Sequence, residues 1–154
     1  MIIVHHLNNS RSQRILWMLE ELGIPYEVKR YQRDAKTMLA PQSLFDIHPL
    51  GKSPVITDGE ITVAESGAII EYLAQTYGKE KMIPAVNTQA YRDYVYWLHF
   101  SEGSLMPQLL LKLVFDKVKT SPMPFFIKPI AKMISDKVMA GFVSQNIKNN
   151  LDYI

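Results

Sequence analysis

The segment SPVITDGEITVAES, residues 53–66, constrains the fold more than any other part of the chain. Two short runs rich in β-forming residues flank Asp58-Gly59. That dipeptide favours a tight hairpin turn of type I′, in which both central residues need positive φ. The segment therefore predicts an antiparallel hairpin, and Pro54 is placed at the first position of its first strand, where a missing N–H is tolerated.

The segments around the hairpin predict a mixed α/β domain. Residues 2–4 are an apolar run typical of a buried strand, and residues 12–22 carry apolar positions at helical spacing that end at Gly23. Residues 26–31 alternate like a second strand, which should lie parallel to the first because a helix connects them. Residues 35–49 predict irregular backbone with one short helix, and residues 66–78 predict a helix closed by a glycine.

The remainder of the chain has only helical patterns. Residues 79–87 break the periodicity and are interpreted as a linker, and residues 88–154 predict two long helices with Gly103 and Pro107 as kink positions in the first. The last helix reaches Ile154 with its apolar face still running. We therefore expect an incomplete all-helical domain at 88–154, whose apolar faces are covered by further helices or by a partner subunit.

Composition narrows the function classes. With 47% apolar residues among 154, the chain can bury a core, and a net charge of +2 with interspersed signs gives no electrostatic reason to bind nucleic acid. The chain has no cysteine, so any sulfur chemistry must use a sulfur that the substrate brings. The four histidines are too scattered for a metal site, so no metal is expected.

The sequence also indicates where the protein works. The start, MIIVHHLNN, lacks the basic flank and the long apolar run of a signal peptide. No later apolar segment approaches the length that a membrane-spanning helix needs. We expect a cytoplasmic protein without membrane attachment.

Ser10 is the first candidate for chemistry, and it allows two interpretations. With Gln13 it matches the S-x-x-Q capping box, which satisfies free amides at a helix start and needs no function. Alternatively, a hydroxyl donor at the positive end of a helix is suited to hold a thiolate. The local sequence leaves both open.

Two further positions have the same ambiguity. A cis peptide between Ser53 and Pro54 would leave the Ser53 amide open to pair with an extended peptide, whereas an ordinary turn proline would not. Ser66 follows a strand and begins a helix, where free amides can bind a carboxylate, but a serine there is commonly only the N-cap.

The ordered motifs SRSQRILWMLEELGIPYEV and HPLGKSPVITDGEITVAESGAIIEYLAQTYG resemble the thioredoxin-like domain of the cytosolic glutathione transferases, of the serine type found in bacteria and fungi. The resemblance implies an α/β plus all-α protein: a thioredoxin-like domain with a mixed four-stranded sheet at 1–78, followed by a partial helical bundle. It also implies a homodimeric enzyme that conjugates glutathione, bound as thiolate, to an electrophilic small molecule, with a possible peroxidase side activity. The alternative is a related non-catalytic module that serves binding or protein interaction without turnover.

The resemblance implies a role for each site residue. Ser10 would donate to the glutathione sulfur, with Ser12 and Asn9 as neighbours that could share or replace that role. Pro54 matches the family's cis-proline, and the Glu65-Ser66 pair matches the residues that receive the γ-glutamyl end. The expected glutathione-binding residues are Asn9, Lys52, Ser53, Pro54, Glu65 and Ser66, with Lys52 reaching the glycyl carboxylate.

Overall fold

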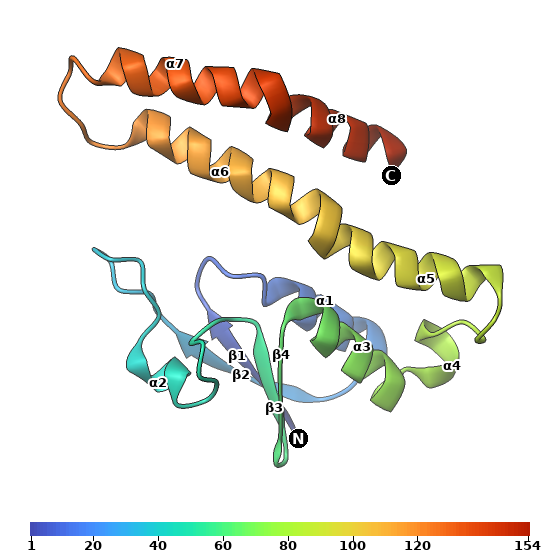
Figure 1. The fold of residues 1–154 in the computed structure, drawn as a ribbon. Coiled ribbons are helices and arrows are strands. Elements are labelled where there is room, and N and C mark those ends of the chain that lie inside the picture. The colour runs from blue at the N-terminus through green and yellow to red at the C-terminus, as the bar shows by residue number, and fades with distance from the viewer. The chain divides into compact units, whose positions relative to one another are not determined.

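The chain divides into two compact units, Met1–Tyr91 and Arg92–Ile154, in a computed structural model that describes residues 1–154 (Figure 1). The linker expected at 79–87 falls near the end of the first unit, and only the side chains of residues 79 and 80 lie outside the described part of the structure. The boundary between a glutathione-binding domain and a helical domain therefore stays a prediction.

The first unit contains one mixed sheet. Its strands are β1 (Ile2–Leu7), β2 (Tyr26–Tyr31), β3 (Val55–Asp58) and β4 (Ile61–Ala64), in the order β2-β1-β3-β4. β1 is parallel to β2 and antiparallel to β3, and β3 is antiparallel to β4. The expected mixed four-stranded sheet is confirmed. β1 extends beyond the apolar run at 2–4 because its whole length pairs with β2.

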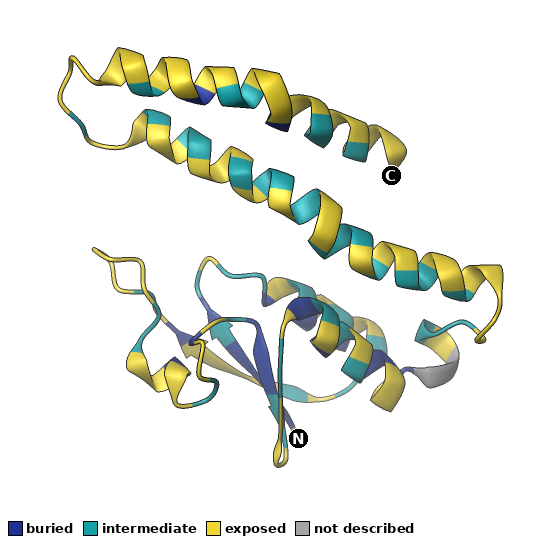
Figure 2. Ribbon diagram, viewed as in Figure 1, coloured by how far each residue is buried: buried dark blue, intermediate teal, exposed yellow. Residues whose placement is uncertain are grey.

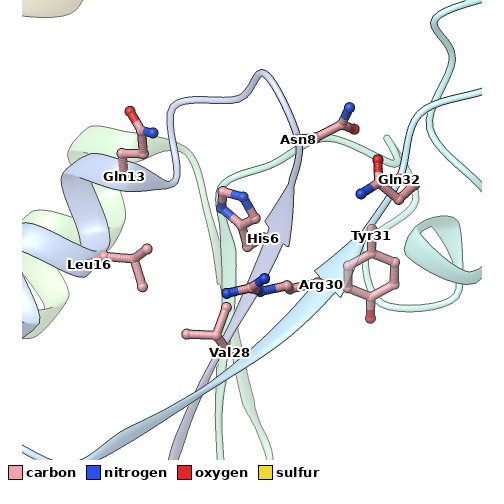
Figure 3. Close-up of a pocket in the computed structure, with 8 residues that line it drawn as sticks. All are labelled: His6, Asn8, Gln13, Leu16, Val28, Arg30, Tyr31 and Gln32. Atoms are coloured by element: carbon pink, nitrogen blue, oxygen red, sulfur yellow. The ribbon is translucent and has the colours of Figure 1, made fainter. Parts of the chain in front are cut away.

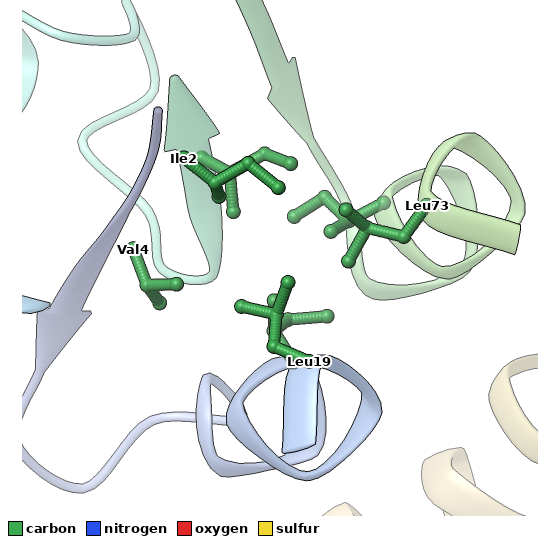
Figure 4. Packing of buried hydrophobic residues seen from close by; sticks show 7 residues of the cluster. Ile2, Val4, Leu19 and Leu73 are labelled. Atoms are coloured by element: carbon green, nitrogen blue, oxygen red, sulfur yellow. The ribbon is translucent and has the colours of Figure 1, made fainter. Parts of the chain in front are cut away.

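Helices α1 (Gln13–Leu22) and α3 (Ser66–Tyr77) pack against the sheet, and two short helices, α2 (Gln42–Phe45) and α4 (Lys79–Met82), complete the unit. Alternation along β1 sends Ile2 and Val4 to the face that α1 and α3 cover. The core there consists of Ile2, Val4, Ile15, Leu19, Ile56, Ile69 and Leu73 (Figure 4). A second cluster, formed by Leu7, Tyr31, Leu44 and Val55, contains the buried residue of α2.

The hairpin turn differs from the expected type. Asp58 pairs with Ile61, so Gly59 and Glu60 are the two central residues rather than Asp58 and Gly59. Gly59 has φ +60, whereas Glu60 is not among the residues with positive φ. Positive φ at the first central position alone is the pattern of a type II′ turn, so the type I′ prediction is wrong because the register places glycine first.

Asp58 ties the hairpin to α3. Its carboxylate accepts hydrogen bonds from the hydroxyls of Tyr77 and Tyr72, the latter at 2.9 Å, and lies 3.9 Å from the N-terminal amine. The Tyr77 bond is the main reason that the pKa of Asp58 is lowered, and the same bond raises the pKa of Tyr77 to about 12. Asp58 is therefore held in its charged form by the folded chain.

We expect Asp58→Asn to lower the free energy of unfolding at pH 7 by about 1 kcal/mol, the scale of one hydrogen bond. A folded pKa below the unfolded one stabilises the fold above a pH of about 4, and this stabilisation is lost as the pH falls through the folded pKa. The difference between wild type and variant should therefore shrink in acid. Urea unfolding at several pH values measures this difference in the free energy of unfolding. Asp152→Asn, which removes a carboxylate from an exposed ion pair, is the control. A difference that does not change with pH would contradict the prediction.

The second part of the chain forms two long helical segments. The first comprises α5 (Gln89–Phe100), the π-helix η1 (Ser101–Leu105) and α6 (Met106–Thr120). The second comprises α7 (Lys128–Val138), the π-helix η2 (Met139–Val143) and α8 (Ser144–Tyr153). Gly103 lies inside η1, and Pro107 lies at the start of α6 directly after it. The expected irregularity therefore takes the form of a single π turn, one of the known causes of kinks in long helices.

The unit Arg92–Ile154, all of which the structure describes, buries little of its apolar surface. Only Ser135 and Val143 are buried among these described residues, and side chains such as Leu113, Ile130 and Met133 are more than half exposed (Figure 2). Two helical runs alone offer each other only one face, so the rest stays on the surface. That further helices or a partner cover these faces stays a prediction. Within the described residues, no helix combines the length and apolar character needed to cross a bilayer.

Candidate functional site

Ser10 lies in the loop between β1 and α1 and is not the cap of the helix. The helix begins at Gln13, and its N-cap is Ser12, which has right-handed helical angles and no side-chain capping bond. A turn at Asn8 and Asn9, the latter with φ +53, precedes Ser10, and a second turn at Arg11 and Ser12 separates Ser10 from the helix. The capping-box interpretation is therefore wrong, because Ser10 comes two residues before the N-cap.

The Ser10 hydroxyl joins two distant parts of the chain. Its Oγ lies 2.9 Å from Ser12 Oγ and 3.1 Å from Ser53 Oγ, the latter 43 residues away in sequence. Ser12 is fully buried, and its Oγ lies 2.7 Å from Nδ1 of His6. Ser10 is half-buried and Asn9 is exposed, so Ser12 is the hydroxyl that a ligand cannot reach directly.

Ser53 contributes to the site through its peptide bond to Pro54 and through hydrogen bonds of its side chain. The Ser53-Pro54 peptide bond is cis. The Ser53 hydroxyl donates to the His5 carbonyl oxygen at 2.9 Å and accepts from the Leu7 N–H at 3.3 Å. Because β1 and β3 pair only as far as Val4 and Ile56, this side chain continues the ladder beyond the start of β3. Sequence reasoning considered only the Ser53 backbone and missed this role.

Glu65 and Ser66 form the junction from β4 into α3. Glu65 is the N-cap, with φ 75° and ψ 130°, a backbone conformation that costs a non-glycine residue about 1–3 kcal/mol. Its carbonyl accepts from the Ile69 N–H at 2.9 Å, and Ser66 is the buried first residue of the helix. Ser66 is therefore not the cap. It stands among the free amides of the first turn, where an anion is favoured.

The sheet brings these positions to one edge. β3 is antiparallel to β1 and β4, so its beginning lies beside the ends of both other strands. The β1–α1 loop, the cis-proline directly before β3 and the start of α3 therefore lie at the same edge of the sheet. Lys52 is exposed just before Ser53, and no hydrogen bond or ion pair among the described residues joins Lys52, Glu65 or Ser66 to Ser10.

A separate pocket of about 300 Å³ lies between α1, β1 and β2 (Figure 3). It is lined by His6, Asn8, Gln13, Leu16, Val28, Arg30, Tyr31 and Gln32, none of which is a predicted site residue. The sequence contained no signal for it, because its lining residues come from two strands and a helix that meet only in the folded chain. His6 connects this pocket to the Ser12 hydroxyl.

The adjacent histidines face opposite sides of the sheet, as strand alternation requires. His5 is buried, with Nδ1 2.9 Å from the Tyr31 hydroxyl and Nε2 3.2 Å from Thr57 Oγ1. Burial is the main cause that lowers the pKa of His5, followed by the charge of Lys29. No group of metal-ligating side chains is found among the residues that the structure describes.

Comparison with known proteins decides the family. Residues 1–75 match the model of the glutathione S-transferase N-terminal domain. Glutathione S-transferase 1 of Saccharomyces cerevisiae is 36% identical over 159 residues, which cover 99% of this chain and 68% of that protein. The chain belongs to the glutathione S-transferase family.

Two other similar proteins support the assignment of this chain to the glutathione S-transferase family. Glutathione S-transferase 3 of Schizosaccharomyces pombe is 41% identical over all of the chain and 62% of its own length. A solved glutathione S-transferase structure from Actinobacillus pleuropneumoniae superposes with a TM-score of 0.67 at 38% identity, over 92% of this chain and 64% of that one. The expected fold class is confirmed, and the chain spans about two thirds of the length of these relatives.

Proposed function

We propose that the chain binds glutathione, stabilises its thiolate and directs it to an electrophilic small molecule. The observation that carries this proposal is the Ser10 hydroxyl, which lies 3.1 Å from the hydroxyl of the residue before the cis-proline. The relatives named glutathione S-transferase support it. The enzyme would act in the cytoplasm as a homodimer, as expected for the family, and would need no metal.

Each remaining site residue has a task that its position supports. The γ-glutamyl carboxylate would bind at the first turn of α3, where Ser66 and the free amides lie. The exposed Glu65 carboxylate would hold the γ-glutamyl ammonium, and the exposed Lys52 ammonium would hold the glycyl carboxylate. The backbone of Ser53 beside Pro54 would pair with the extended tripeptide, and Asn9 would border it from the loop before α1.

The thiolate needs no general base. Lowering a thiol pKa from about 8.5 to about 6.5 requires about 2.7 kcal/mol of differential stabilisation. A charge-assisted hydrogen bond from the Ser10 hydroxyl would supply about 1.5–3 kcal/mol, and the nearby helix N-terminus about 0.5 kcal/mol more. Together they supply about 2–3.5 kcal/mol, a range that includes the required stabilisation. At neutral pH the thiol proton leaves to solvent.

The binding half of the proposal is tested at Ser66. We expect Ser66→Ala to weaken the affinity for glutathione about tenfold, because a hydrogen bond to the carboxylate is lost while the helix amides remain. Isothermal titration calorimetry measures the dissociation constant, and Ser144→Ala, the same change at an exposed serine of α8, is the control. Unchanged affinity would remove Ser66 from the site. Glutathione binding without turnover would favour the non-catalytic module.

A further inference from the structure

Four side chains form a continuous row of hydrogen bonds from the pocket to the candidate site. His6 Nδ1 lies 2.7 Å from Ser12 Oγ, Ser12 Oγ lies 2.9 Å from Ser10 Oγ, and Ser10 Oγ lies 3.1 Å from Ser53 Oγ. The row ends at the carbonyl oxygen of His5, 2.9 Å from Ser53 Oγ. The proposed function assigns no role to His6 or Ser12.

Counting protons gives this row a single direction. The His5 carbonyl can only accept, so the one hydroxyl proton of Ser53 is used there. Ser10 must then donate to Ser53, and Ser12 must donate to Ser10. The Ser12 hydroxyl has no second proton, so Nδ1 of His6 must carry a proton and donate to Ser12.

The acceptor sites agree with this direction. Ser53 Oγ accepts from the Leu7 N–H in addition to Ser10, and Ser10 Oγ accepts from the Ser12 N–H at 3.4 Å in addition to the Ser12 hydroxyl. Both oxygens thereby use their two lone pairs. Ser12 is fully buried, so no solvent can take the place of His6.

We infer that His6 and Ser12 are positioning residues that orient and strengthen the Ser10 hydroxyl as the donor to the glutathione thiolate. This inference rests on the proposed function. When the sulfur arrives, Ser10 exchanges its acceptor Ser53 for the thiolate, while the bonds from His6 to Ser12 and from Ser12 to Ser10 stay in place. A hydroxyl that accepts a hydrogen bond becomes a better donor, so the row strengthens the bond to sulfur without transferring a proton along it.

The row of hydrogen bonds begins at the pocket, because its first residue, His6, lines that pocket. His6 lines it from β1, and Figure 3 shows its ring between α1 and the side chains of β2. Gln13 and Arg30 line the same pocket and add polar groups to it beside the apolar Leu16 and Val28. Solvent there can hydrogen-bond the ring nitrogen that Ser12 does not use, so the tautomer that donates through Nδ1 leaves no ring nitrogen unsatisfied.

The test measures the thiol pKa of bound glutathione from the ultraviolet absorbance of the thiolate. We expect His6→Leu and Ser12→Ala to raise this thiol pKa by about 0.5–1 unit. At a pH below the thiol pKa, that rise lowers the thiolate fraction about three- to tenfold. His6→Asn, whose side-chain amide can donate near the position of Nδ1, should restore most of the shift. His99→Leu, at an exposed histidine of α5, is the matched control.

Glutathione affinity distinguishes a positioning role of His6 from damage to the fold. At a pH where glutathione is bound as the thiol, His6→Leu should change its dissociation constant less than about twofold, whereas a disturbed fold would weaken binding at every pH. A thiol pKa that is the same in His6→Leu as in wild type would overturn the inference. Failure of the wild type to bind glutathione would instead overturn the proposed function.

Discussion

Replacing Ser10 with alanine is expected to raise the thiol pKa of bound glutathione by about 1–2 units, because the charge-assisted hydrogen bond of about 1.5–3 kcal/mol is lost. Conjugation of a model electrophile near pH 6.5 should fall about 5- to 50-fold, in proportion to the thiolate fraction. The loss should shrink as the pH is raised, because the thiol then ionises without help. Rate against pH, together with thiolate absorbance, measures both effects.

Two variants make the Ser10 result specific. Ser10→Thr keeps a hydroxyl and should retain most of the pKa shift, and Ser144→Ala makes the same chemical change on the exposed surface of α8. Glutathione affinity at a pH where the thiol is bound should change little in Ser10→Ala, since the tripeptide ends bind elsewhere. Equal thiol pKa values in Ser10→Ala and wild type would remove Ser10 from the sulfur and leave it a loop residue.

Leu19→Ala is expected to lower the free energy of unfolding of the first unit by about 2–5 kcal/mol, the range for emptying a buried leucine site. Leu19 is fully buried on α1 and belongs to the cluster with Ile2, Ile69 and Leu73. Neighbours held by the sheet and by α3 cannot collapse fully into the space. Since a domain has only about 5–15 kcal/mol of stability in total, the variant should be close to unfolding at 37 °C.

The Leu19 effect can be measured locally. The chain has two tryptophans, so in a Trp97→Phe background the fluorescence of Trp17 reports on α1 alone during urea unfolding. Leu39→Ala is the control, since Leu39 is 66% exposed and should change stability by less than about 0.5 kcal/mol. A loss below about 1 kcal/mol for Leu19→Ala would mean that the cluster does not support the fold as described.

The elements of the first unit could be predicted from local patterns. The strand at 26–31, the hairpin and the helix from Ser66 were all visible as periodicity bounded by glycine or proline. Errors occurred where tertiary pairing decides a boundary. β1 runs past its apolar residues to Leu7 because β2 pairs with it, and the hairpin turn shifts by one residue because Asp58 pairs with Ile61.

The candidate site was only partly visible in the sequence. Ser10, Pro54 and the Glu65-Ser66 pair were found because each has a recognisable neighbourhood. The roles of Ser12, His6 and the Ser53 hydroxyl could not be found, because they depend on contacts such as the one between Ser10 and Ser53, 43 residues apart. The same geometry removed the capping-box interpretation, since a turn separates Ser10 from α1.

The sequence by itself determined the order of strands and helices, the family, and which residue types could meet glutathione, because periodicity and turn residues act over a few positions. The tertiary structure alone decided which hydroxyl groups of the site form hydrogen bonds with one another. Sheet pairing brings the end of β1 beside the start of β3, and this places Ser53 within hydrogen-bonding distance of His5, Leu7 and Ser10. Hydrogen bonds act over about 3 Å, so they depend on packing that no local pattern encodes.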